Sequence, residues 1–153
     1  MSPDPIDPFE TDAVNHILFG TDGDEVAQRA QRWAMGIARF WEAQVTVVCA
    51  YDSPKSFRKR GSIYLPEVRR EMEQEAEEIV RESVEEFVAA GITAEGVVYE
   101  GDVEDAILET AEQITPDVIV IGGGGGGGAR DYLVGSNVER IVRHSTVAVL
   151  VIK

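Results

Sequence analysis

Short apolar runs punctuate most of this chain and predict its strands. Residues 45–50, 117–122 and 147–152 are rich in Val and Ile, residues 16–21 hold Ile, Leu and Phe, and a weaker run covers 93–99. Runs of five or six residues that are apolar on both faces are typical of strands buried in a parallel sheet. The sequence therefore predicts five strands in one buried sheet.

The segments between these runs carry helical periodicity. Apolar residues spaced by three and four predict helices that begin at Asp24, at Pro66 and after Asp102, and a short one at 136–144. The predicted buried faces are Val26, Ala30, Trp33, Ile37 and Phe40 in the first helix, Val68, Met72, Ala76, Ile79 and Phe87 in the second, and Val103, Ala106, Ile107, Ala111 and Ile114 in the third. Gly91 is placed to end the second helix. Alternating strands and helices predict an α/β fold with a doubly wound parallel sheet, helices covering both faces.

Length and local composition divide the chain simply. Residues 1–14 hold three prolines and several acids, which predicts a flexible leader, and 15–153 fit a single domain. Residues 51–65 carry Pro54, Gly61 and a basic cluster. We interpret them as a solvated loop, with a ligand-gripping lid as the alternative.

Charge and composition narrow the function classes. With 28 acidic against 14 basic residues the net charge is −14, which disfavours nucleic acid and anionic lipid as partners. No apolar run reaches the roughly 18 residues of a membrane helix, and no secretory signal is visible. The one cysteine, Cys49, lies in an apolar strand and reads as an inert core residue. We expect a cytoplasmic protein without a membrane anchor.

Catalytic groups are sparse. His16 and His144 have no visible serine or cysteine partner, and Trp33 and Trp41 read as core residues of the first helix. No arginine finger or general base is evident near the glycine-rich segment that follows the fourth strand. We expect no enzyme, with slow ATP hydrolysis as the weaker alternative.

The glycine-rich segment carries the strongest chemical signal. It runs as Gly122, two residues, Gly125, nine residues, then Gly135-Ser136 at the start of a helix. Glycines let the backbone approach a phosphate closely, and a helix N-terminus adds free N–H groups and a positive dipole end. The segment lacks the lysine of a Walker loop. Two structural alternatives need no ligand. Either Gly122–Gly128 is only a flexible connector, or Ser136 and Glu139 form a capping box.

A second segment lies where a ligand is expected in such a sheet. Ligands bind beyond the strand C-termini where the winding reverses, and Thr21-Asp22-Gly23 follow the first strand there. Asp22 is either a ligand contact or the N-cap of the first helix. Asp24 is either a magnesium ligand or a favourable acid in the first turn of that helix.

From about residue 15 to 153 the chain resembles the universal stress protein family. The matching stretches are 17–23, which resembles the opening strand and aspartate, the Gly122-x2-Gly125-x9-Gly135-Ser136 spacing of the ATP-binding branch, and 133–136, 139–141 and 149–152. The resemblance implies the strand order 3-2-1-4-5, with strands one and four adjacent at the reversal.

The resemblance also implies a ligand and its contacts. ATP, with magnesium, would place its adenine and ribose against Asp22 and the backbone near Ala50, and its ribose against Gly122. Its phosphates would lie among Gly125, Gly135, Ser136 and Asn137. Gly20, Thr21 and Gly124 flank these positions and complete the candidate site.

The sequence departs from the family in ways that favour a second function. Residues 123–127 are all glycine, where family members carry polar or basic residues. Freezing four or five glycines costs about 2–5 kcal/mol in all, at about 0.5–1 kcal/mol each. The alternative to an ATP-responsive module is therefore an interaction protein that has lost or weakened nucleotide binding.

The last strand suggests an assembly. In the implied order, residues 146–152 form an apolar edge of the sheet, and such an edge tends to pair with another copy. The resemblance likewise implies a homodimer through this strand.

Overall fold

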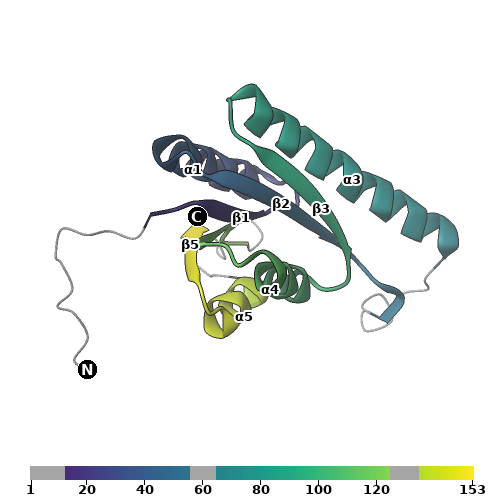
Figure 1. Ribbon diagram of the computed structural model, residues 1–153. Helices are drawn as coiled ribbons and strands as arrows, with labels where there is room; N and C mark the ends of the chain where they lie inside the picture. The colour runs from purple at the N-terminus through teal and green to yellow at the C-terminus, as the bar shows by residue number, and fades with distance from the viewer. Residues whose placement is uncertain (1–12, 56–64, 125–134) are drawn as a thin grey trace.

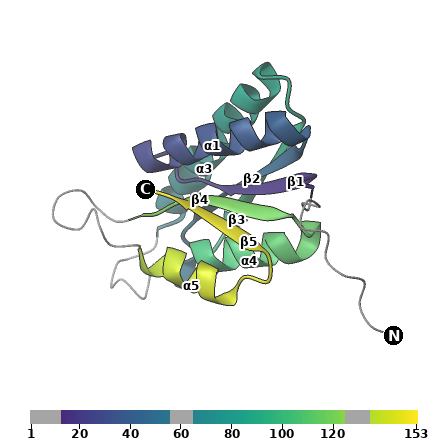
Figure 2. The ribbon, with the colours of Figure 1, turned by 90° about the vertical axis from the view of Figure 1, so that its left-hand side faces the viewer.

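The computed structural model describes residues 13–55, 65–124 and 135–153. Five strands form one parallel sheet in the order β3-β2-β1-β4-β5. Their bounds are His16–Gly20 for β1, Gln44–Tyr51 for β2, Ala94–Glu100 for β3, Val118–Gly122 for β4 and Ala148–Ile152 for β5. The predicted doubly wound parallel sheet is confirmed, with β1 and β4 adjacent at its centre (Figures 1 and 2).

Helices cover both faces of this sheet. The bounds are Glu25–Trp41 for α1, Pro66–Ala89 for α3, Val103–Ile114 for α4 and Ser136–His144 for α5. Helices α1 and α3 pack on one face around Phe19 and Phe87, whose rings meet edge to face at 5.9 Å. Helices α4 and α5 pack on the other face around Leu18 and Ile107. Because both faces are covered, the central strands are apolar throughout, as the sequence predicted.

Local chemistry sets the helix ends. Pro66 occupies the first turn of α3, where its missing N–H costs no hydrogen bond. Gly91 takes a φ of +81° just after α3, which only glycine adopts without strain, so it ends the helix as expected. Asp102 stands at the N-cap of α4, although its side chain makes no capping bond there.

The predicted buried face of α1 is wrong in part. The buried stripe consists of four alanines, Ala27, Ala30, Ala34 and Ala38, together with Gln31, and of the predicted face only Ala30 belongs to it. Trp33 and Phe40 are instead 57% and 79% exposed, and Trp41 only partly packs against the core. The alanines let α1 lie close to the sheet, and this close approach turns the aromatic side chains outward.

The edges of the sheet are as the sequence implied. β5 is an edge strand, with Ala148 exposed and the following three residues half-buried. Within the described residues no helix is long and apolar enough to cross a membrane. Residues 1–12 of the predicted leader, the basic residues Arg58, Lys59 and Arg60 of the 51–65 loop, and Gly125 fall outside the described residues.

Candidate functional site

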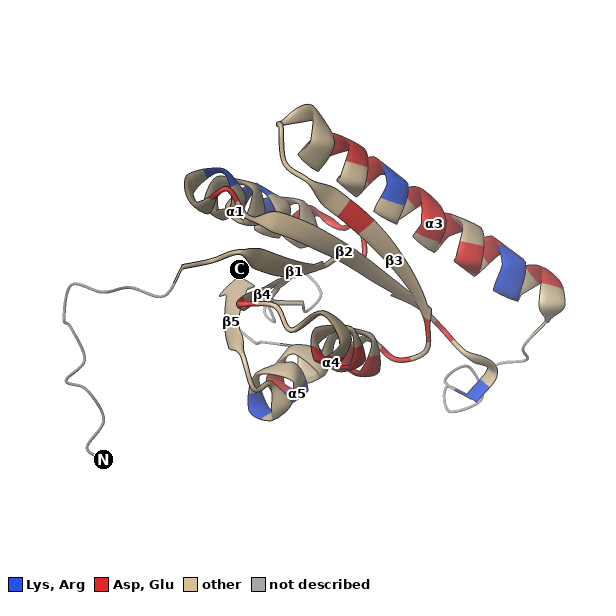
Figure 3. Ribbon diagram, in the orientation of Figure 1, with Lys and Arg blue, Asp and Glu red and all other residues tan. Residues whose placement is uncertain are grey.

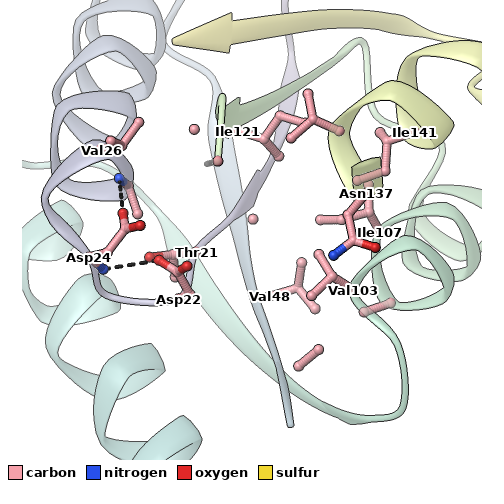
Figure 4. Close-up of a pocket in the computed structure, with 17 residues that line it drawn as sticks. Thr21, Asp22, Asp24, Val26, Val48, Val103, Ile107, Ile121, Asn137 and Ile141 are labelled. Carbon is pink, nitrogen blue, oxygen red and sulfur yellow. Dashed lines mark hydrogen bonds between the residues drawn. The ribbon is translucent and has the colours of Figure 1, made fainter. Parts of the chain in front are cut away.

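A cleft opens where β1 and β4 end, at the reversal of the winding. It holds about 150 Å³ and is bounded by the β1–α1 turn on one side and by α4 and α5 on the other (Figure 4). Most of its wall is aliphatic, with Val48, Ile107 and Ile121 at its floor. A small apolar slot with a few polar groups at its rim suits a flat organic ring.

Consecutive hydrogen bonds fix the β1–α1 turn at the rim of this cleft. The Thr21 N–H donates to the Val48 carbonyl at 3.0 Å, and the Gly23 N–H donates to Thr21 Oγ1 at 3.0 Å. The Asp24 N–H donates to Asp22 Oδ1 at 3.0 Å. These bonds hold the Asp22 carboxylate at the cleft without the help of a ligand.

Asp24, rather than Asp22, caps the first helix. Its Oδ1 accepts the Ala27 N–H at 2.7 Å. The alternative that made Asp22 the N-cap is therefore wrong, and the bland interpretation of Asp24 as a helix-stabilising acid is close to its actual role.

Electrostatics at Asp22 differ from those of an ordinary surface acid. Partial desolvation against the cleft wall raises the pKa of its carboxyl, and repulsion from the Asp24 carboxylate raises it further. The donated backbone bond from Asp24 opposes this shift without cancelling it. Asp22 is thus a carboxylate whose negative charge is poorly compensated within the protein.

The N-terminus of α5 lies at the far side of the cleft. Gly135 is the N-cap and contributes no side-chain capping bond, and Ser136 is the first helical residue. The predicted capping box therefore does not form, because it would need Ser136 one position earlier. The first N–H groups of α5 keep their positive dipole end without a side chain over it.

Backbone contacts hold this helix end beside β4. The Gly135 N–H donates to the Gly123 carbonyl at 2.9 Å, and the Gly123 N–H donates to the Ile152 carbonyl at 2.6 Å. Gly124 has a φ of +66°, which favours glycine. A Cβ on Gly122 would lie 3.0 Å from Val26 Cγ1 and 3.3 Å from the Ala27 nitrogen. The close approach of α1 thus favours glycine at 122, and the positive φ favours glycine at 124.

A second hollow continues the cleft past the end of β2. It holds about 520 Å³ and shares four lining residues with the cleft: Asp22, Ala50, Val103 and Asn137. Asp52, Glu75 and Asp102 add three more carboxyl groups. Among the described residues that line the two hollows there is no Lys or Arg. The described part of the chain also brings no three His, Cys, Asp or Glu residues together as a metal site.

The structure brings most of the predicted site residues together. Those that line the cleft are Gly20, Thr21, Asp22, Ala50, Gly122, Gly124 and Asn137. Asn137 points into the cleft from α5, facing the β1–α1 turn across it (Figure 4). Gly135 and Ser136 stand at the start of α5 without lining the cleft, and Gly125 lies outside the described residues.

Sequence reasoning missed the apolar walls. Nine further residues line the cleft or its rim, mostly from the inner faces of α1, α4 and α5: Val26, Ala27, Val48, Val103, Ala106, Ile107, Ile121, Val138 and Ile141. Several were predicted only as core. The sequence did contain a signal for these walls. When a helix follows a strand, its first apolar residues lie at the same edge of the sheet as the end of that strand.

The remaining candidates have structural roles. Cys49 is buried, and burial with the nearby carboxylates of Asp22 and Glu75 raises the pKa of its thiol to about 11. His16 Nε2 lies 2.7 Å from Thr46 Oγ1, and His144 Nδ1 lies 2.8 Å from Glu104 Oε1. The burial of Cys49 and its raised thiol pKa agree with the prediction that this cysteine is an inert core residue.

Comparison with known proteins gives a consistent result. The sequence model of the Universal stress protein family matches residues 13–153. A universal stress protein of Methanocaldococcus jannaschii is 34% identical over 140 residues, which are 90% of this chain and 81% of the relative.

Solved structures share the fold. Universal stress protein UspA from Lactobacillus plantarum superposes with a TM-score of 0.78 at 22% identity, over 94% of this chain and all of that one. A universal stress protein in complex with cAMP has a TM-score of 0.66 at 26% identity, over 92% of this chain and 97% of that one.

Proposed function

Because the chain belongs to the universal stress protein family, we propose that it is a stress-response protein that binds ATP with magnesium in the cleft at the ends of β1 and β4. It acts as a nucleotide-responsive homodimer rather than as an enzyme. One observation supports this most: the Asp22 carboxylate, an apolar slot and the uncapped N-terminus of α5 meet at a single cleft. A related structure holds cAMP, which is an adenine nucleotide.

The base and ribose suit the inner part of the cleft. An adenine ring is flat and largely apolar on its faces, so it fits between Val48 and Ile107 on the aliphatic wall. Its amine and the ribose hydroxyls are donors, and the Asp22 carboxylate and the backbone at Ala50 are acceptors at the rim. Gly122 leaves the end of β4 without a side chain that would obstruct the ribose.

The phosphates suit the start of α5. The free N–H groups and dipole of the first turn favour an anion, and the Ser136 hydroxyl and the Asn137 amide add donors. Gly124 and Gly135 allow the backbone to come close to the phosphate oxygens. Gly125 belongs to the same proposed contact set through the spacing of the motif.

Charge makes magnesium important here. No described residue of the cleft or the adjoining hollow supplies a positive side chain, while Asp22 and Asp24 are negative. A bare triphosphate would therefore meet repulsion that the helix dipole only partly offsets. Mg²⁺ is held by phosphate oxygens and water in such sites and reduces the charge of the ligand. We expect affinity for ATP to depend strongly on magnesium.

The negative charge of the cleft and its glycine-rich border favour a second candidate function. An all-glycine stretch at 123–127 offers no basic partner to the phosphates, and ordering it costs free energy. The chain would then serve as an interaction protein whose cleft binds nucleotides weakly or not at all. In either case we propose a cytoplasmic homodimer that pairs through the apolar edge strand β5.

Calorimetric titration tests the proposed site. ATP with magnesium is titrated into the full chain and into a Ser136→Ala, Gly135→Val double variant, with Thr93→Ala as the control. Thr93 is exposed at the opposite end of the sheet, where its backbone carbonyl accepts the Val45 N–H. We expect a Kd in the micromolar range, about −8 kcal/mol or weaker, that the double variant loses and the control keeps.

The outcomes separate the two candidate functions. Without magnesium, ATP should bind at least about tenfold more weakly, a loss of about 1.4 kcal/mol. No binding at millimolar ATP with magnesium would reject the nucleotide site and favour the interaction protein. Binding that survives in the double variant would place the phosphates away from α5.

A further inference from the structure

An aromatic groove runs along α1 outside the nucleotide cleft. It holds about 470 Å³ and is lined chiefly by Trp33, Ile37, Phe40 and Trp41, with Gly36 at its middle. Trp33 and Phe40 are 57% and 79% exposed. The Trp41 ring meets the Phe40 ring edge to face at 5.3 Å and holds it in this exposed position. Large apolar rings gathered on one helix mark a binding surface.

The groove borders the edge strand β5. Helix α1 packs mainly on β4 and also contacts β5 (Figure 2). Arg29 Nε, in the first turns of α1, donates to the carbonyl of Lys153 at the end of β5, at 3.1 Å. Ile37 and Trp41 pack against the same core cluster as Leu150 of β5. The groove and the edge strand therefore form one continuous surface.

The acidic charge of the protein lies away from this surface. Helix α3 holds nine acids against three arginines, and α4 holds four acids and no basic residue (Figure 3). Helices α1 and α5, which pack beside β5, hold one acid each against three and two arginines. The strand β5 itself holds no charged residue. Because the whole chain has a net charge of −14, two copies meet with least repulsion at this edge.

The middle of the groove is level with the middle of β5. Arg29 is level with the end of β5, and α1 runs against the direction of the strands. Leu150 lies about 10 Å back along the strand at about 3.3 Å per residue, and Gly36 lies about 10 Å along the helix at about 1.5 Å per residue. A twofold axis through the middle of an antiparallel β5 pair therefore passes close to Gly36. It sets Trp33 of each copy opposite Phe40 of the other.

The size of the two rings matches the gap that such a pair would leave. Two α1 helices that each lie over β4 would be three strand spacings apart, or about 14 Å. Helices with ordinary side chains pack at about 8–10 Å, so a wider gap needs large ones. Trp33 and Phe40 supply them, and a Cβ on Gly36 would meet nothing within 4 Å, so the groove has room for a ring.

The exposed area of the rings is also large enough to matter. From their exposed fractions, Trp33 and Phe40 present about 300 Å² per copy, or about 600 Å² in a pair. This is about a third to a half of the roughly 1,200–2,000 Å² that a stable interface buries. A strand of five residues leaves that share to be supplied by its neighbours.

We infer that the aromatic groove of α1 forms the second half of an interface between two copies of this chain, with Trp33 of each copy packed against Phe40 of the other. The inference rests on the proposed pairing through β5 and extends that interface from the strand to the helix. Arg32 then lies level with the partner's Phe40, where a guanidinium over an aromatic face is favourable.

Sedimentation equilibrium of the full chain tests the contribution of the helix. Phe40→Ser removes one exposed ring, and its exposure in the single chain means that the fold does not depend on it. Val88→Ser is the matched control, because Val88 is also exposed on a helix but lies on α3, which covers β2 and β3. We expect Phe40→Ser to raise the Kd of the dimer at least about tenfold and Val88→Ser to leave it unchanged.

Trp33 provides a second readout that reports directly on the groove. The chain has two tryptophans, so Trp41→Phe leaves Trp33 as the sole one and keeps an aromatic ring beside Phe40. We expect the Trp33 emission of the dimer to lie at shorter wavelength than that of the same protein diluted below its Kd, because pairing removes the ring from water. Phe40→Ser in this background should reduce the shift.

The outcomes separate this inference from the pairing on which it rests. A Phe40→Ser dimer as tight as the parent, or Trp33 emission that is the same in dimer and monomer, would overturn the inference and leave pairing through β5 intact. A monomeric parent, or a dimer that survives Val149→Pro, would reject both. Assemblies that grow beyond a dimer with concentration would mean that the groove takes a different surface of the next copy, which also overturns the inference.

Discussion

Gly122 is where fold and proposed function meet most closely, so its replacement gives a demanding test. It ends β4, lines the cleft and faces α1. A Cβ there would lie 3.0 Å from Val26 Cγ1, and 3.3 Å from the Ala27 nitrogen and the Val26 carbonyl carbon. The first neighbour can rotate away, but the other two are helix backbone. α1 must therefore move by a few tenths of an ångström to admit even alanine.

The magnitude follows from two opposed effects. Overpacking costs about 1–3 kcal/mol, and the contacts at 122 put alanine at the low end and valine at the high end of that range. Replacing glycine also restricts the unfolded chain, which returns about 0.4–1 kcal/mol. We expect Gly122→Ala to change the free energy of unfolding by at most about 1 kcal/mol, and Gly122→Val to lower it by about 1–3 kcal/mol. In a domain of this size the valine variant should melt lower by about 2–12 °C.

Two measurements on the same variants separate stability from binding. Urea unfolding gives the free energy of unfolding, and calorimetry gives the affinity for ATP with magnesium. Because valine projects into the proposed ribose position, we expect Gly122→Val to weaken the binding of ATP at least about tenfold. Gly36→Ala is the control, since its Cβ meets nothing and alanine is favoured by about 0.5–1 kcal/mol inside a helix. It should stabilise the protein and leave ATP affinity unchanged. A Gly122→Val variant that binds ATP as well as the parent would refute the placement of the ribose.

Two other predictions address the cleft and the sheet edge. Since the pKa of Asp22 is raised and its ionised form is the acceptor for the nucleotide, ATP affinity should fall as the pH drops through a value above 3.8, and Asp22→Asn should remove this pH dependence. For stability the sign is opposite: an ionised Asp22 destabilises the fold above its raised pKa, so Asp22→Asn should raise the melting temperature at pH 7, and a lowered one would contradict the assigned desolvation. At the edge strand, Val149→Pro should convert a dimer to a monomer in light scattering, whereas an unchanged dimer would reject pairing through β5.

Much of the architecture was predictable because the relevant signals are local. Runs such as 117–122 are apolar on both faces only if helices cover both sides of the sheet, and that rule gave the layers correctly. The turn after β1 was located by the same reasoning, since strand C-termini share one edge of a parallel sheet.

The rest depended on distances that spacing does not encode. Two stripes on α1 have the spacing of a buried face, and the sequence favoured the one with Trp33 and Phe40 for its hydrophobicity. The fold buries the alanine stripe, because small side chains let the helix approach the sheet. At α5 a capping box and a bare helix start differ by one residue, and the bond from Gly135 to Gly123 selects the second.

The backbone of Gly123 joins two parts of the molecule through one residue. Its N–H is held by Ile152 at the end of the edge strand, and its carbonyl holds Gly135 at the start of α5. A change in the φ and ψ angles of Gly123 would shift the helix that borders the cleft relative to the strand that borders solvent. If occupancy of the cleft and pairing of the edge are linked through it, thermodynamics requires that each alters the other by the same factor. Gly123 thus connects the helix at the cleft and the strand at the sheet edge through the two hydrogen bonds of its own backbone.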